Sequence, residues 1–158
     1  MPVFNGERYV AKSIQSLLSQ THEYFELIII NDGSKDNTES IIKLFKDKRI
    51  KYFYQKNSGL ASALNRGIGY AVGRYIARQD QDDFSEPDRI ELQLQFLESN
   101  HDISMVGSAA SIWVGDKKTK RQLKHPISDA EIRTDLLFYN RFVHSSVMVR
   151  ANVIKALG

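Results

Sequence analysis

The stretch FELIIINDGSKDNTESIIKLFKD, residues 25–47, contains the three elements that decide the fold. Its first six residues form a short, isoleucine-rich apolar run, which is typical of a strand buried on both faces of a sheet. The polar segment NDGSKDNT follows. Apolar residues at helical spacing come next, with Asn37 or Thr38 in the position of a helix cap. This succession of strand, loop and helix predicts an α/β protein.

The same alternation continues on both sides of this stretch. Further strands are expected in the segments IKYFYQ (50–55) and RYIAR (74–78). Helical patterns occupy ERYVAKSIQSLLSQ (7–20), SGLASALNRGIGYAVG (58–73) and EPDRIELQLQFLESN (86–100). Strands separated by helices of this length predict a Rossmann-like, mainly parallel open sheet flanked by helices, in a single domain over residues 1–158.

The alternation of predicted strands and helices becomes less regular after residue 100. We expect a long strand in ISMVGSAASIWV (103–114), an exposed basic turn in DKKTKRQ (116–122) and a helix in SDAEIRTDLLFY (128–139). A strand in VHSSVMVR and a last helix in ANVIKALG complete the pattern. At the front, MPVFNGERYV is loop-like and lacks the apolar strand that normally precedes such a loop. We therefore expect the domain to be clipped at its first strand.

Composition limits the classes of function. The chain has 158 residues, 42% hydrophobic and 26% charged, which is ordinary for a globular protein. The net charge of +3 does not indicate nucleic acid, but it allows a mild attraction to phosphates or to an anionic membrane surface. The absence of cysteine excludes disulfides and thiolate metal sites. Without a signal sequence or an apolar run of about 20 residues, the expected location is the cytoplasm.

Three polar loops follow predicted strands, namely PVFNGE (2–7), NDGSKDNT (31–38) and RQDQDDFSEP (78–87). In open parallel sheets, ligands bind beyond the carboxyl ends of the strands. The first loop offers Phe4 as a flat stacking surface, unless the ring is simply core, and Glu7 as a hydrogen-bond acceptor. In the second, Asp32 can accept hydrogen bonds from a ligand, although this loop also reads as an ordinary turn.

The third loop places Asp80, Asp82 and Asp83 within four positions. Clustered carboxylates repel one another unless a cation or hydrogen-bond donors compensate them, and hard divalent cations prefer oxygen ligands. One of the first two aspartates could meet a metal and the other a ribose hydroxyl. A solvated acidic turn before the helix at Pro87 is the open alternative. A calcium-binding EF-hand loop is excluded, because Phe84 and Ser85 stand where a ligand and the turn glycine are needed.

Four ordered blocks carry a resemblance to a known family: MPVFNGERYV, ELIIINDGSKDNT, NSGLASALNRGIGYAVGRYIARQDQDD and PDRIELQ. Together they resemble the family 2 glycosyltransferases of the GT-A fold. The late stretch FVHSSVMVRANVIKALG is similar to the bacterial members that build O-antigen, capsule or exopolysaccharide, which implies a role in polysaccharide biosynthesis of the cell envelope.

The resemblance implies a nucleotide-sugar site with an Asp-x-Asp (DXD) element. Asp32 matches the aspartate that binds the base, usually uracil, and Asn31 replaces the more common aspartate before it. Asp80 matches the ribose-contacting aspartate and Asp82 the metal-binding one, with Asp83 beside them. The other implied site residues are Pro2, Phe4 and Glu7 around the nucleotide, Asn57 and Gly59 next to it, and His144 in the donor and acceptor region, where a structural histidine is an equal alternative.

The implied reaction is inverting transfer from a nucleotide diphosphate sugar, with a UDP-sugar favoured, to a saccharide or lipid-linked acceptor. Mn²⁺ or Mg²⁺ held by Asp82 would neutralise the leaving diphosphate, and a general base would deprotonate the acceptor. The family's base lies beyond the position of Gly158, so the catalytic residue is unassigned; Asp129, Glu131 and Asp135 do not match it. The acceptor would place the protein at the inner face of the cell membrane.

Two other classes of function compete with this one. A binding module could hold a nucleotide sugar without turning it over, which the unassigned base favours. A nucleotidyltransferase would need a glycine-rich, basic phosphate loop after the first strand, and PVFNGE lacks one. A nucleic-acid binder is not expected, because basic and aromatic residues do not interleave on one predicted face.

Overall fold

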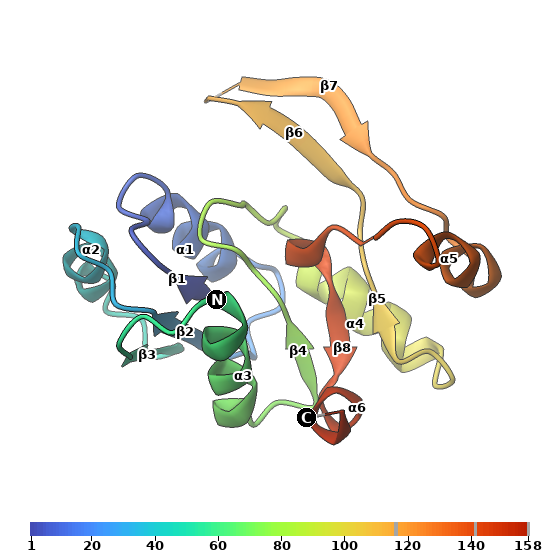
Figure 1. Cartoon of the computed structure of the whole chain (residues 1–158), viewed down its shortest axis with the longest axis horizontal. Helices are drawn as coiled ribbons and strands as arrows, with labels where there is room; N and C mark the ends of the chain where they lie inside the picture. The colour runs from blue at the N-terminus through green and yellow to red at the C-terminus, as the bar shows by residue number, and fades with distance from the viewer. Residues whose placement is uncertain (116, 141, 158) are drawn as a thin grey trace.

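The computed structural model describes residues 1–115, 117–140 and 142–157. Asp116, with which the predicted basic turn begins, and Gly158 lie outside the described residues. The elements are arranged around two small sheets and a hairpin that projects from the rest of the protein (Figure 1).

The first sheet is parallel and has the order β1-β2-β3, from strands β1 (Pro2–Val3), β2 (Leu27–Asn31) and β3 (Ile50–Tyr54). The sequence predicted a loop at residues 2–3, but these residues pair with β2 and form a short strand. Every residue of β2 is buried, as its isoleucine-rich run predicted. The carboxyl ends of all three strands therefore lie at one edge of this sheet.

Helices alternate with strands along the chain at the predicted positions: α1 (Val10–Leu18), α2 (Thr38–Leu44), α3 (Leu60–Tyr70) and α4 (Arg89–Ser99). The apolar stripe of α1 is buried in the main core, where Ile14 contacts no solvent and meets residues of β2 and α4. A second, smaller apolar cluster joins the other face of β2 to α3 through Ile30 and Ala63. Apolar contacts on both faces explain why β2 carries no polar alternation.

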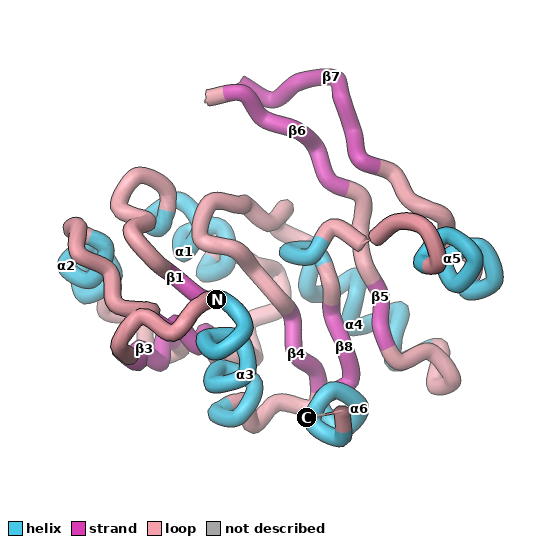
Figure 2. Tube along the Cα trace, viewed as in Figure 1, coloured by secondary structure: helices cyan, strands magenta, loops and turns pink. Residues whose placement is uncertain are grey.

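The second sheet has the order β4-β8-β5, from β4 (Tyr75–Ala77), β8 (Met148–Arg150) and β5 (Met105–Val106). Strand β8 is antiparallel to both neighbours, so the late part of the chain returns to lie between two earlier strands (Figure 2). The strand expected over 143–150 is shorter than predicted, because His144–Ser146 form a 3-10 turn, η1. Helix α6 (Ala151–Ala156) follows directly.

The region between β5 and η1 departs most from the sequence prediction. The long strand expected over 103–114 is divided into β5 and β6 (Ala110–Val114). The predicted basic turn is wrong: its residues form strand β7 (Lys117–Leu123), which pairs antiparallel with β6. The lysine-rich sequence concealed the strand, because its partner and not its own apolar pattern stabilises it. Helix α5 (Asp129–Leu136) has no buried residue among those described.

No helix within the described ranges combines the length and apolarity that crossing a membrane requires.

Candidate functional site

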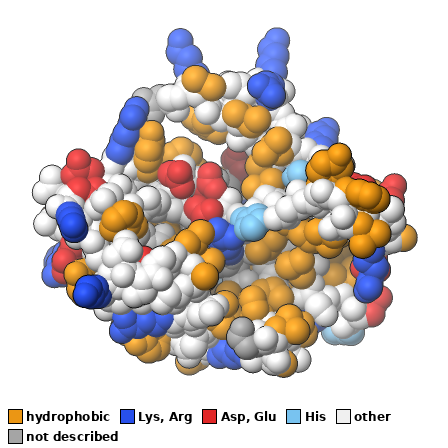
Figure 3. All heavy atoms as spheres, in the orientation of Figure 1, with side chains coloured by type: hydrophobic (Ala, Val, Ile, Leu, Met, Phe, Trp, Pro, Cys, Tyr) orange, Lys and Arg blue, Asp and Glu red, His pale blue; other side chains and the backbone are white. Residues whose placement is uncertain are grey.

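The loops after β1, β2, β3 and β4 meet around one cleft of about 290 Å³. Figure 3 shows a group of acidic side chains near the centre of one face of the molecule. Seven of the ten residues that the sequence predicted for the site line the cleft. The lining is Pro2, Val3, Phe4, Asp32, Asn57, Gly59, Leu60, Ala63, Asp80, Gln81 and Asp82. The three predicted residues outside this lining are Glu7, Asp83 and His144.

A larger cavity of about 490 Å³ lies between the two sheets. Side chains such as Ile28, Ile76 and Met148 make its lining mostly apolar, and of the predicted site residues only Pro2 reaches it. The smaller cleft, with its three aspartates, is therefore the site that suits a polar ligand.

Asp32 is fixed at the end of β2 by three hydrogen bonds. Its Oδ1 accepts from Gln55 Nε2 at 2.7 Å and from the amide of Ser58 at 2.9 Å, and its Oδ2 accepts from the amide of Gly59 at 2.9 Å. Burial by itself raises the pKa of this carboxyl, but the three donors outweigh burial and the pKa lies below its ordinary value. Asp32 is thus held ionised, with Oδ2 accepting one described bond and Oδ1 two.

The turn after Asp32 depends on a glycine. Gly33 has φ +77°, a conformation that side chains rarely adopt, and a Cβ there would lie 2.8 Å from the amide nitrogen of Asn57. Asn31, which replaces an aspartate of the family pattern, is completely buried and braces the same turn. Its Nδ2 donates to the Tyr52 hydroxyl at 2.8 Å and its Oδ1 accepts from the Ser34 amide at 2.9 Å. An uncharged amide suits this pair of partners, one an acceptor and one a donor.

Gln81 joins the first loop, residues 2–7, to the third loop, residues 78–87, which we call the acidic loop. Its Oε1 accepts from the Phe4 amide at 2.8 Å and its Nε2 donates to the Phe4 carbonyl at 3.1 Å. The Phe4 ring is 42% exposed beside the cleft, so it is available as a stacking surface and is not part of the core. Sequence reasoning missed Gln81, since a glutamine between two aspartates carries no signal of its own.

Glu7, which was predicted beside the nucleotide, is not part of the cleft lining. Its Oε2 accepts from the backbone amide and from the side-chain amide of Asn37, both at 3.0 Å, so it braces the start of α2. The Glu7 amide donates to Asp36 Oδ2 at 3.0 Å. These bonds hold the first two loops together behind the cleft.

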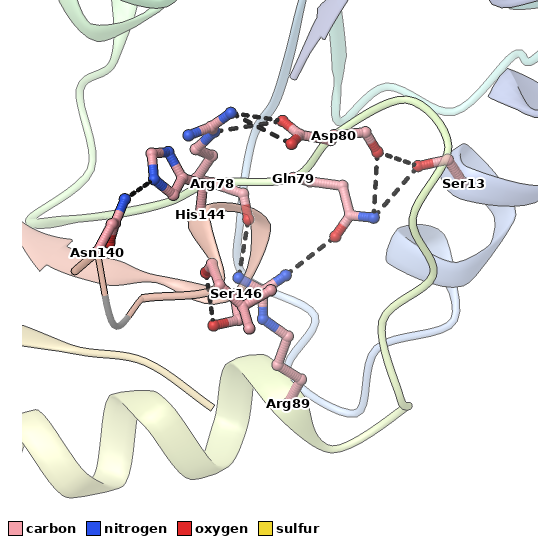
Figure 4. Close-up of polar contacts among 9 residues, drawn as sticks. Ser13, Arg78, Gln79, Asp80, Arg89, Asn140, His144 and Ser146 are labelled. Carbon is pink, nitrogen blue, oxygen red and sulfur yellow. Dashed lines mark hydrogen bonds and ion pairs between the residues drawn. The ribbon is translucent and has the colours of Figure 1, made fainter. Parts of the chain in front are cut away.

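The three aspartates of the acidic loop have different surroundings. Asp80 forms an ion pair with Arg78, whose Nη2 lies 3.0 Å from Oδ1 and 3.2 Å from Oδ2 (Figure 4). Partial desolvation raises the pKa of Asp83, the Ser145 hydroxyl lowers it, and the charges of Asp82 and Asp80 raise it further. Asp82 is exposed at the cleft. The loop is therefore partly compensated within the protein, and Asp82 is its exposed carboxylate that lines the cleft.

A partly buried arginine holds this loop in place. Arg89 Nη2 donates to the Arg78 carbonyl at 2.8 Å, and its Nη1 donates to Gln79 Oε1 and Ser85 Oγ, both at 2.9 Å. Gln79 in turn donates to the Asp83 carbonyl at 2.6 Å. Burial lowers the pKa of Arg89 to about 10, against the opposing effect of Asp83. From the sequence, Arg89 was predicted only to belong to a helix, and no role at the site was expected for it.

The same cluster reaches the second half of the chain. Arg89 Nε donates to Gln93 Oε1 at 3.2 Å, and Gln93 Nε2 donates to the Ser146 carbonyl of η1 at 2.6 Å. Figure 4 draws Ser146 close to Arg89, and His144 hydrogen-bonded to Asn140. His144 is exposed on η1 but is not part of the cleft lining.

The donor set at the cleft suits a cation that takes most of its ligands from a bound substrate. No group of three metal-ligating side chains occurs among the residues that the structure describes. Within the described part of the cleft lining, Asp82 is the aspartate that has no described ion-pair or hydrogen-bond partner, which matches Mg²⁺ or Mn²⁺ bound by one or two carboxylates together with phosphate oxygens.

Fold and cleft together define an α/β protein with an acidic cleft at the carboxyl edge of its parallel strands. The profile of glycosyl transferase family 2 matches residues 1–158, and the chain belongs to this family. An uncharacterized glycosyltransferase of Haemophilus influenzae is 39% identical over 96% of this chain and 50% of its own length. The putative glycosyltransferase EpsE of Bacillus subtilis is 35% identical over 99% of this chain and 57% of its own. The chain thus spans about half the length of these relatives.

Solved structures agree on the fold. TarS residues 1–349 from S. aureus, in complex with UDP, superposes with a TM-score of 0.74 over 99% of this chain and 47% of that protein, at 18% identity. Glucosyl-3-phosphoglycerate synthase from Mycobacterium tuberculosis, also with UDP, gives a TM-score of 0.67 over 96% and 55%, at 16% identity.

Proposed function

We propose that the cleft binds the nucleotide diphosphate sugar of a metal-dependent glycosyl transfer reaction. The observation that carries this proposal is the meeting of four strand ends at one cleft, which brings Phe4, Asp32, Asp80 and Asp82 together. Family membership supports the class of reaction. The structures of TarS with UDP and with UDP-GlcNAc support UDP as the first nucleotide to test.

Each residue has a distinct task in this proposal. Phe4 stacks on the base, and Asp32 Oδ2 accepts a hydrogen bond from a base imide, as its fixed and ionised state favours. Asp80, oriented by Arg78, accepts from a ribose hydroxyl. Leu60 lines the cleft in the first turn of α3, so the positive end of this helix faces the site and favours an anionic ligand.

Asp82 would hold the Mn²⁺ or Mg²⁺ ion, which supplies positive charge to the leaving diphosphate when bound. The acceptor is proposed to be a saccharide or a lipid-linked saccharide, used in building an envelope polysaccharide. Binding of the donor without turnover is the competing function, and the two are separated by assaying both affinity and sugar transfer.

Calorimetric titration of UDP tests the donor site. We expect UDP affinity to rise when Mn²⁺ is present, and this dependence to disappear in Asp82→Ala. Asp102→Ala is the matched control, because Asp102 is an exposed aspartate outside the cleft lining. GDP and dTDP are titrated in the same way. If none of the three nucleotides binds, or if Asp102→Ala abolishes the metal dependence as well, the proposal is wrong.

A further inference from the structure

The β6–β7 hairpin concentrates positive charge. Residues 103–128 contain five basic side chains against the single acidic residue Asp116, a net +4, whereas the complete chain carries only +3. The remainder of the protein is therefore slightly acidic. The basic residues are Lys117, Lys118, Lys120, Arg121 and Lys124. Four of them belong to β7, and all are exposed.

Exposed apolar side chains accompany these cations. Trp113 is 46% exposed, Val114 70% and Leu123 44%. Figure 3 shows Lys and Arg side chains extending from the end of the molecule that the hairpin forms, with hydrophobic side chains beside them. Lysine and arginine stems, tryptophan and aliphatic side chains in such a mixture are typical of surfaces that lie on a lipid headgroup layer.

We propose that the β6–β7 hairpin docks the protein onto an anionic membrane surface. Charge complementarity selects the bilayer as the occupant, because clustered cations gain from the negative potential of anionic lipids. Helix α5 and the turn after it also expose large apolar residues, including Leu136, Leu137 and Phe138, but the helix carries Asp129, Glu131 and Asp135 against Arg133. Because helix α5 carries a net negative charge, an anionic surface would repel it, and we assign membrane docking to the hairpin alone.

The hairpin is connected to the candidate site. Lys118 Nζ lies 2.9 Å from Glu86 Oε1, and the Trp113 ring meets the Phe84 ring edge to face, with centroids 6.2 Å apart. Glu86 and Phe84 both belong to the acidic loop, residues 78–87. Docking through the hairpin would therefore bring the cleft close to the bilayer, where a lipid-linked molecule is accessible.

The single tryptophan of the chain lies on this hairpin and reports on docking. The protein is mixed with vesicles of phosphatidylcholine alone, or of phosphatidylcholine with about 30% phosphatidylglycerol. We expect co-sedimentation and a blue shift of Trp113 fluorescence with the anionic vesicles only, and loss of both when salt screens the charges. Brominated lipid should quench the same emission, and Trp113→Phe should remove the signal while co-sedimentation persists.

Two matched charge reversals locate the surface. Lys120→Glu/Arg121→Glu changes the hairpin, and Lys46→Glu/Lys48→Glu makes the same change in net charge at exposed positions outside it. Each cation near an anionic surface is worth about fivefold in binding, so the hairpin variant should bind at least about 25-fold more weakly. The control should retain most of its binding. Far-UV circular dichroism checks that both variants are folded.

Three results would overturn the proposal. The first is equal binding to neutral vesicles, and the second is an equal loss of binding in the two double variants. The third is binding to a soluble polyanion such as heparin without binding to anionic vesicles, which would assign the hairpin to a charged polymer. None of these measurements depends on nucleotide binding, so the test is independent of the proposed donor site.

Discussion

The two parts of the molecule before and after residue 100 are built differently. In the first part every residue of β2 is buried, and α1, α3 and α4 pack apolar residues into the two clusters that include this strand. In the second part α5 buries none of its described residues, and β7 is almost entirely exposed. The comparison teaches that the candidate site rests on a packed scaffold, whereas the basic hairpin presents its side chains to the surroundings.

Contacts that cross the boundary between the two parts help to hold the site. The acidic loop follows β4 in the first part, yet Gln93 and Asp83 fasten its surroundings to Ser146 and Ser145 of η1. A loop with three carboxylates is thus positioned by groups from both parts. We expect mutations in the core, beneath the acidic loop and at Asp32 to lower stability by different amounts.

The largest effect is expected in the core of the first part. Ile29 is completely buried in β2, so Ile29→Ala should lower the free energy of unfolding by about 4 kcal/mol through lost apolar contacts and a cavity. Leu137→Ala removes a similar side chain that is 79% exposed, and should change stability by less than about 0.5 kcal/mol. Urea denaturation followed by circular dichroism measures both. Equal losses would remove the distinction between the two parts.

A smaller effect is expected for the partly buried cation under the acidic loop. Arg89→Met should cost about 3 kcal/mol, because it leaves the Arg78 carbonyl and Ser85 Oγ without their donor and removes one of the two donors to Gln79 Oε1. It should also weaken UDP binding if the cleft is the donor site. In Arg133→Met, an exposed ion pair with Asp129 is lost, and the cost should be about 0.5 kcal/mol or less.

These two arginine variants are compared by denaturation and by UDP titration under the same conditions. Arg89→Lys keeps the charge but cannot reach all of the acceptors, so it should restore part of the stability and little of the loop geometry. An Arg89→Met protein that keeps both stability and nucleotide affinity would show that this arginine does not position the loop.

The smallest effect concerns Asp32 and depends on pH. Its folded pKa is lowered, so the unfolded chain binds more protons near pH 4, and the stabilisation is complete above the ordinary pKa of about 4. Asp32→Asn should cost about 2 kcal/mol at pH 7, since one amide oxygen replaces two carboxylate acceptors. The difference from wild type should shrink as pH falls below about 4, measured by urea denaturation at several pH values. A constant difference would contradict the lowered pKa.

Much of the first part could be predicted from the sequence alone. Strand β2 is a continuous apolar run and helices α1 to α4 place apolar residues at helical spacing, so both kinds of element could be recognised locally. The meeting of Phe4, Asp32, Asp80 and Asp82 at one cleft followed from placing polar loops at the ends of parallel strands. The same rule cannot tell which side chain of a loop turns toward the cleft, and Glu7 instead binds the start of the next loop's helix.

The later part could not be predicted as well. Strand β7 has no apolar alternation, so only its pairing with β6 reveals it. Strand β8 is recognisable as a strand, but its insertion between β4 and β5 depends on contacts far apart in the sequence.

The sequence by itself determined the α/β class, the order of the early elements and the strand-end position of the acidic residues, because all three are set by local periodicity and chain connectivity. Only the tertiary structure decided which carboxylates are compensated. Arg78 neutralises Asp80, Arg89 and η1 hold the loop, and Asp82 is left facing the cleft. The physical reason is that the free energy of a charge depends on the donors, cations and solvent around it, and folding brings these together from distant parts of the chain.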